Sequence, residues 1–134
     1  KILGMIGLAP APDFPKILIW DKMTSDEKRK LINDKKITIK YEDGSKNDFS
    51  YKLIKDSFRN LTLSKNIYFD GPVYLYHGMA DNAVPYDFSI KIIDTFKGTN
   101  DIKLLLEKDA GHRLSEPHQL ANITKIIEEI VMKI

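Results

Sequence analysis

Residues 73–85 read VYLYHGMADNAVP and residues 102–113 read IKLLLEKDAGHR. Each stretch opens with a short continuous apolar run, which is typical of a strand buried on both faces of a parallel sheet. Each run is followed by a polar loop that contains glycine. Between the two stretches, residues 88–96 carry apolar side chains at helical spacing. This order of strand, loop, helix, strand and loop predicts a parallel α/β sheet.

The pattern extends to both ends of the chain. Residues 2–9, ILGMIGLA, form another continuous apolar run and predict a further strand buried on both faces. After Pro117, an apolar stripe at helical spacing predicts a final helix. The stripe consists of Leu120, Ile123, Ile126, Ile127, Ile130, Val131 and Ile134. We therefore predict one α/β domain over residues 1–134, in which 1–14 and 69–134 contribute about three parallel strands with flanking helices.

The irregular stretch 15–68 is predicted to be an insertion between the first two strands. Thr24 and Glu27 form a T-x-x-E capping box, which predicts a short charged helix ending near Asn33. Residues 37–41, ITIKY, alternate as a short strand does.

The insertion continues with a turn and a second helix. Asp43-Gly44 is a turn signal. A helix is predicted to start near Asn47 or Asp48, because apolar residues then recur at spacings of a helical face. They are Tyr51, Ile54, Phe58 and Leu61.

The composition excludes several classes of protein. The chain has 134 residues, 43% hydrophobic and 30% charged, with a net charge of +2 and no basic stripe, so we expect no nucleic-acid partner. It has no cysteine, and its three histidines form no close pair, so neither a metal site nor a cofactor is expected. No apolar run approaches the length of a membrane span. The first residue is Lys1 and no signal-peptide pattern follows, which predicts a fragment or trimmed chain and a cytoplasmic location.

The two polar loops carry the candidate chemistry. Asp81 follows one predicted strand and His112 follows the next, and the ends of neighbouring parallel strands lie at the same edge of a sheet. A carboxylate beside an imidazole holds the ring in one tautomer, which is the orienting half of a nucleophile–histidine–acid triad. Two alternatives remain: an aspartate in a turn with glycine is often a turn former or helix cap, and a Gly-His dipeptide alone does not indicate catalysis.

Several motifs resemble those of one enzyme superfamily. HGMADNAVP resembles the acid loop, HGxxDxxVP, of the α/β-hydrolases, and DAGHR resembles their histidine loop. The stretches IGLAPAPDF, LIWDKMT, YKLIKD and HRLSEP resemble a subfamily of bacterial α/β-hydrolases related to the mitochondrial abhydrolase-type palmitoyl-protein thioesterases. The resemblance covers the whole chain but only the carboxyl-terminal half of those enzymes.

The resemblance implies roles for particular residues. Asp81 would be the catalytic acid and His112 the general base in the hydrolysis of a carboxylic ester or thioester. Residues 15–68 would form a cap over the acyl pocket, and Trp20 and Met23 could line that pocket, although a tryptophan in a small domain is more often part of the core.

The chain departs from the family in its nucleophile. The family motif G-x-S-x-G precedes the strand that matches residues 2–9, and no serine of this chain lies in such a motif. Ser115 is close to His112 in sequence, but it is better interpreted as the N-cap of the last helix. His77 is interpreted as a structural hydrogen-bonding group, and His118, in the first turn of that helix, as exposed.

Two functions therefore remain open. The chain is either the carboxyl-terminal portion of a serine hydrolase, acting on acyl substrates when an amino-terminal half completes it, or a non-catalytic remnant that serves as an interaction module. In either case the strand at 2–9 would lack its outer neighbour, which predicts a homodimer with Ile2–Ala9 at or beside the interface. The alternative is that the insertion folds back over this edge.

Overall fold

The structure, a computed structural model, describes residues 1–40 and 44–134. The chain forms two compact units. Lys1–Pro12 and Thr62–Ile134 make up the first, which we call the α/β unit, and Asp13–Leu61 make up the second, the insertion unit.

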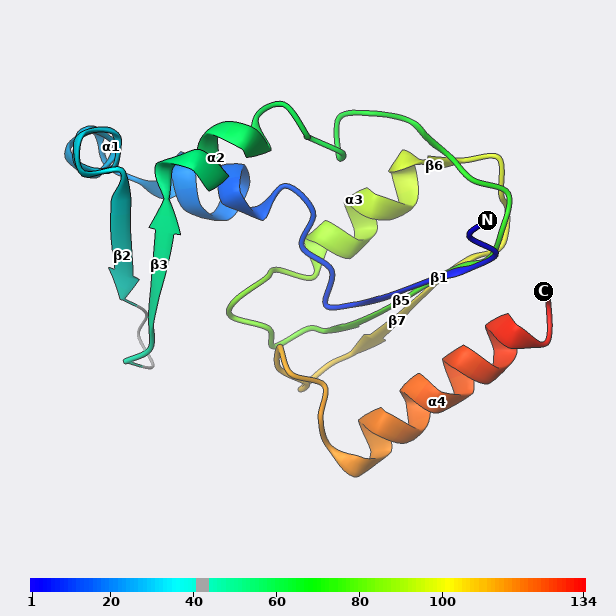
Figure 1. Cartoon of the computed structure of the whole chain (residues 1–134). Helices are drawn as coiled ribbons and strands as arrows, with labels where there is room; N and C mark the ends of the chain where they lie inside the picture. The colour runs from blue at the N-terminus through cyan, green and yellow to red at the C-terminus, as the bar shows by residue number, and fades with distance from the viewer. Residues whose placement is uncertain (41–43) are drawn as a thin grey trace. The chain divides into compact units, whose positions relative to one another are not determined.

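The α/β unit is built on a three-stranded parallel sheet in the order β1–β5–β7 (Figure 1). Its strands and helices are β1 (Met5–Leu8), β4 (Ile67–Tyr68), β5 (Val73–Gly78), α3 (Asp87–Thr95), β6 (Phe96–Lys97), β7 (Ile102–Glu107) and α4 (Pro117–Val131). The predicted α/β class with three parallel strands and flanking helices is confirmed.

Helices α3 and α4 cover opposite faces of this sheet (Figure 1). Every residue of the central strand β5 is buried, as its continuous apolar run predicts. Val73 and Leu75 pack with Ile92 of α3 in one core cluster. Tyr76 belongs to a second core cluster, against which Ile126 of α4 packs. The alternation of side chains along one strand thus supplies two apolar layers.

Two details of the helices differ from the sequence predictions. Phe96 was predicted to lie in the helix of residues 88–96, but it belongs to β6, where it pairs with Ile67 of β4. The N-cap of α4 is Glu116 rather than Ser115. Glu116 and Gln119 form a reciprocal capping box, in which the Glu116 N–H donates to Gln119 Oε1 at 3.0 Å, and this motif fixes the start of the helix one residue later.

The first strand is less buried than predicted. β1 alternates between half-buried and exposed residues, and Ile6 and Leu8 are 38% and 43% exposed. The reason is its position, because β1 is an edge strand among the described residues and pairs only with β5.

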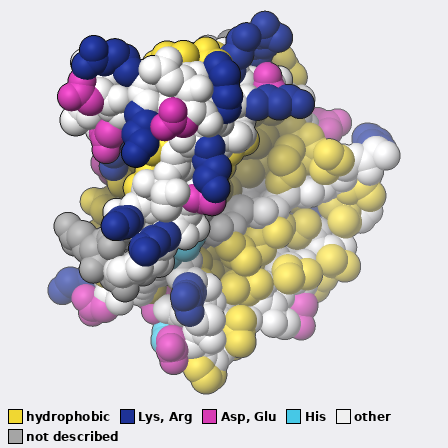
Figure 2. All heavy atoms as spheres, turned by 60° about the vertical axis from the view of Figure 1, so that its left-hand side comes forward, with side chains coloured by type: hydrophobic (Ala, Val, Ile, Leu, Met, Phe, Trp, Pro, Cys, Tyr) yellow, Lys and Arg dark blue, Asp and Glu magenta, His cyan; other side chains and the backbone are white. Residues whose placement is uncertain are grey.

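The apolar stripe of α4 is also only partly covered. Ile130 is buried, but Leu120, Ile127 and Val131, which share one side of the helix, are exposed. Exposed hydrophobic side chains are prominent on the face of the molecule in Figure 2.

The insertion unit consists of short elements around its own core. They are η1 (Pro15–Ile19), η2 (Trp20–Lys22), α1 (Ser25–Asp34), β2 (Lys36–Lys40), β3 (Lys46–Ser50) and α2 (Tyr51–Ser57). The core is formed by Ile19, Met23, Leu31, Ile37, Phe49 and Ile54. The predicted capping box is present at α1: the Glu27 N–H donates to Thr24 Oγ1, and the Thr24 N–H donates to the Glu27 carboxylate.

The predicted helix start near Asn47 or Asp48 is wrong. Lys46–Ser50 is the strand β3, which pairs antiparallel with β2, and the helix α2 begins only at Tyr51. The Ser50 hydroxyl accepts a hydrogen bond from the Leu53 N–H at 3.1 Å and caps α2. Of the predicted turn, Gly44 has a positive φ of 82°, as a turn glycine can. Asp43 lies outside the described residues, as does Tyr41 at the end of the predicted strand.

Candidate active site

The candidate site lies where β5 and β7 end. The two strands are parallel neighbours in a register that pairs Gly78 with Glu107. The loops that follow are tied to each other by backbone hydrogen bonds: the Met79 N–H donates to the Glu107 carbonyl at 2.8 Å, and the Ala80 N–H donates to the Ala110 carbonyl at 3.0 Å. The chain order β5–α3–β7 thus brings two loops that are distant in sequence into contact.

Gly78 permits this close approach. A Cβ atom at this position would lie 2.1 Å from the Ala110 carbonyl oxygen and 2.8 Å from that of Gly111. Both neighbours are backbone atoms, which cannot rotate away as a side chain can. The glycine at the end of β5 is therefore a packing requirement of the two loops.

The structure brings Asp81 and His112 into direct contact. His112 Nδ1 lies 2.8 Å from Asp81 Oδ2. A carboxylate can only accept, so Nδ1 carries the proton, and the neutral ring keeps Nε2 free as a base. The Asp81 side chain is fully buried, whereas that of His112 is 48% exposed, so the ring can be reached from solvent.

The second oxygen of Asp81 is held by the backbone. Asp81 Oδ1 accepts the N–H groups of Ala83 and Val84, both at 2.8 Å. Burial acts to raise the pKa of the Asp81 carboxyl, but the hydrogen bonds from Val84, His112 and Ala83 outweigh burial and hold the pKa below its usual value. Asp81 is therefore an anion at neutral pH, as a group that orients an imidazole has to be.

The contact that the structure gives His112 is with Asp81, at 2.8 Å. The predicted absence of the nucleophile from this chain stays a prediction. The predicted catalytic roles of Asp81 and His112 therefore rest on a pair, and they stay predictions.

The other histidines lie outside this pair. His118 is exposed on α4 and contacts Glu107 Oε1 at 2.8 Å, in agreement with its predicted exposure. His77 is completely buried and contacts Asp81, a contact that sequence analysis did not anticipate. The only sequence signal for it was the position of His77 at the end of an apolar strand, four residues before Asp81.

The two predicted pocket residues belong to the insertion unit. Met23 is buried in the core of that unit. Trp20 packs edge-on against Phe58, with ring centroids 5.7 Å apart, and Lys28 Nζ lies 5.1 Å from the centroid of the Trp20 ring. These contacts agree with the core interpretation left open by the sequence, and a role in substrate binding stays a prediction.

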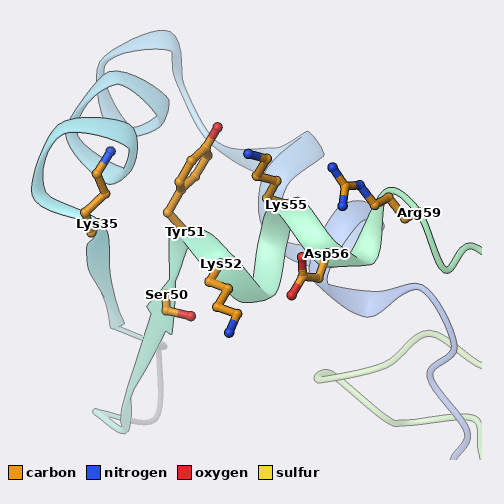
Figure 3. Close-up of a pocket in the computed structure, with 7 residues that line it drawn as sticks. All are labelled: Lys35, Ser50, Tyr51, Lys52, Lys55, Asp56 and Arg59. Carbon is orange, nitrogen blue, oxygen red and sulfur yellow. The ribbon is translucent and has the colours of Figure 1, made fainter.

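The insertion unit also contains an open pocket of about 540 Å³ (Figure 3). Tyr51, Lys55 and Arg59 extend from the same side of the α2 segment, and Lys35 lies on the other side of the Tyr51 ring (Figure 3). The complete lining is Lys35, Ser50, Tyr51, Lys52, Lys55, Asp56 and Arg59. The pocket is strongly basic and contains none of the predicted site residues.

Two general features of the described residues concern metal ions and membranes. No group of three or more histidine, aspartate or glutamate side chains is arranged to hold a metal ion in 1–40 and 44–134. In the same part of the chain, no helix is both long and apolar enough to cross a membrane.

Comparison with known sequences gives a family and a set of relatives. The profile of the prolyl oligopeptidase family matches residues 16–129. The bovine protein named mitochondrial palmitoyl-protein thioesterase ABHD10 is 26% identical over 137 aligned residues, which cover 100% of this chain and 44% of the relative. The chain thus spans less than half the length of this curated relative.

Solved structures show the same fold. A protein of Agrobacterium vitis assigned as a hydrolase superposes with a TM-score of 0.90 at 30% identity, over 97% of this chain and 50% of that one. The mouse α/β-hydrolase domain-containing protein 10 superposes with a TM-score of 0.86 at 23% identity, over 99% of this chain and 53% of that one.

Proposed function

This chain belongs to the prolyl oligopeptidase family of α/β-hydrolases, and from that premise we propose that it is the acid–base portion of a serine hydrolase that cleaves carboxylic esters or thioesters. The observation that carries the proposal is the 2.8 Å contact between His112 Nδ1 and Asp81 Oδ2, which leaves His112 Nε2 available. The thioester specificity is supported by the name of the bovine relative, a palmitoyl-protein thioesterase.

In the proposed reaction, a serine from outside this chain attacks the acyl carbon. Its hydroxyl proton passes to His112 Nε2, and the imidazolium that forms is stabilised by Asp81. His112 then gives the proton to the departing alcohol or thiol, which leaves an acyl-serine. A water molecule, deprotonated by the same nitrogen, releases the carboxylic acid and restores the serine.

The proposal makes this chain the carboxyl-terminal portion of the enzyme, which acts on an acyl substrate once an amino-terminal half supplies the nucleophile and the oxyanion-hole donors. The matched relatives are about twice as long as this chain, which supports the proposal that it is one portion of such an enzyme. Residues 15–68 are proposed to be the cap of the acyl pocket, with contributions from Trp20 and Met23. The retained contact between Asp81 and His112 favours this function over a non-catalytic module.

Fusion to a relative tests the proposal. The portion of the Agrobacterium vitis protein that this chain does not match would be joined to it, and hydrolysis of an activated ester and an acyl thioester would be measured. We expect activity that falls by about 10³-fold or more in His112→Gln and Asp81→Asn, and that persists in the matched control His118→Gln. A His112→Gln fusion that is folded by circular dichroism and as active as His118→Gln would contradict the assignment.

We also propose that the chain by itself forms a homodimer through β1. This strand has a free edge among the described residues, and Ile6 and Leu8 expose apolar area beside it. The cytoplasm is our proposed location, although the curated relatives are named as mitochondrial proteins.

A further inference from the structure

The His77 side chain is completely buried and has three polar contacts. Its Nδ1 lies 2.7 Å from the hydroxyl of Ser89, a buried residue of α3. Its Nε2 lies 3.0 Å from the Val84 carbonyl oxygen and 3.2 Å from Asp81 Oδ2. The ring therefore bridges a helix and the loop that carries the proposed catalytic acid.

These contacts select one tautomer of His77. The Val84 carbonyl can only accept a hydrogen bond, so Nε2 carries a proton and shares it between Val84 and Asp81. In the neutral ring, Nδ1 then has a lone pair and accepts the Ser89 hydroxyl proton. Every polar atom of the two side chains is satisfied in this arrangement, as burial requires.

Asp81 Oδ2 consequently lies between two imidazole rings. One donor is the buried His77 Nε2–H at 3.2 Å, and the other is the half-exposed His112 Nδ1–H at 2.8 Å. The two backbone N–H groups on Oδ1 fix one end of the carboxylate, and His77 restrains the other end. Only His112 can reach a substrate, because His77 has no exposed surface.

We propose that His77 is a positioning residue, which directs Oδ2 of Asp81 toward His112. The Val84 carbonyl keeps its ring in the tautomer that donates from Nε2, and the Ser89 hydroxyl holds the opposite side of the ring in place. The inference rests on the proposed function, in which Asp81 sets the tautomer of His112. A residue that merely fills the core would stabilise the fold without changing the tautomer of a ring that it does not touch.

The test reads the tautomer of His112 directly. Imidazole ¹⁵N chemical shifts of the whole chain would be recorded at about pH 9, above the range in which histidine usually titrates. In the unmodified chain we expect the Nδ1–H form of His112 to predominate. In His77→Phe, which keeps an aromatic ring but removes the donor, we expect the ratio of Nδ1–H to Nε2–H forms to fall by about fivefold or more.

Three further variants make the result decisive. Ser89→Ala removes the hydroxyl that holds His77 Nδ1, so the ring is less firmly placed against Asp81, and it is expected to lower the same ratio by about twofold or more. His77→Gln retains an N–H donor of similar reach and is expected to restore at least half of the ratio. His118→Gln, at an exposed histidine, is the matched control and should leave the ratio unchanged.

Each outcome decides the question. A folded His77→Phe chain with the unmodified ratio would overturn the proposal. If that variant does not fold, Ser89→Ala decides in its place, and an unchanged ratio there would also overturn it. Failure of the proposed function would look different, because an unmodified His112 in the Nε2–H form would contradict the contact with Asp81 itself.

Discussion

Replacing Gly78 with alanine should separate the two loops that carry Asp81 and His112. The new methyl group would lie 2.1 Å from the Ala110 carbonyl oxygen, whereas ordinary contact begins at 3.4 Å. The loops must therefore move apart by roughly 1 Å or more. That movement would stretch the 3.0 Å hydrogen bond from the Ala80 N–H to the Ala110 carbonyl and the 2.8 Å contact between His112 and Asp81.

The loss of stability in Gly78→Ala has two contributions. Overpacking of a well-packed interior costs about 1–3 kcal/mol. A weakened buried hydrogen bond adds about 1 kcal/mol. We therefore expect Gly78→Ala to lower the free energy of unfolding by about 2–4 kcal/mol, measured by urea denaturation followed by circular dichroism.

Gly111→Ala is the matched control, because nothing lies within 4 Å of a Cβ atom at that position. A glycine-to-alanine change in a compatible conformation is neutral or stabilises by about 0.4–1 kcal/mol, since it restricts the unfolded chain. If Gly78→Ala proved as stable as Gly111→Ala, the argument that this glycine is required for packing would be refuted.

Three further predictions concern the chemistry, the pH dependence and the assembly of the chain. A fluorophosphonate probe should leave the isolated chain unlabelled, because in the proposed function the nucleophilic serine lies outside this chain; stoichiometric labelling of any serine would overturn that proposal. Hydrogen bonds from Tyr76, His118 and Gln119 lower the pKa of Glu107 to about 2 from its usual 4.5. This ionised carboxylate therefore stabilises the fold above pH 4.5, and the contribution is lost as the pH falls toward 2. Glu107→Gln should accordingly show a shallower loss of stability over that range, and identical acid titrations monitored by circular dichroism would count against it. Light scattering at micromolar concentration should give a dimer that dissociates in Ile6→Asp with circular dichroism retained, whereas a monomer whose β1 amides resist hydrogen exchange would favour coverage of that edge by the chain itself.

The sheet and the site loops could be predicted because their signals are local. The run at 73–76 is apolar enough to indicate a strand buried on both faces, and the polar loops follow directly after the two strands. Adjacency of parallel strand ends then brings Asp81 near His112 without further information.

The missed features depend on partners that are distant in sequence. Residues 46–50, KNDFS, have little intrinsic preference for a strand, and only pairing with β2 makes them one. The capping box of Glu116 competes with a serine that is equally suitable as an N-cap. The contact of His77 with Asp81 depends on the conformation of the loop between them, which no periodicity encodes.

The acid and the base belong to one β–α–β crossover, from Val73 at the start of β5 to His112 after β7. Their mutual contact spans 31 residues and needs neither the edge strand β1 nor the insertion unit. Closing a loop of this size costs less conformational entropy than closing the longer loop that joins β1 to β5. We therefore expect the segment that contains the pair to fold early, before β1 pairs with β5. The pair should accordingly assemble without waiting for β1 or for the insertion unit.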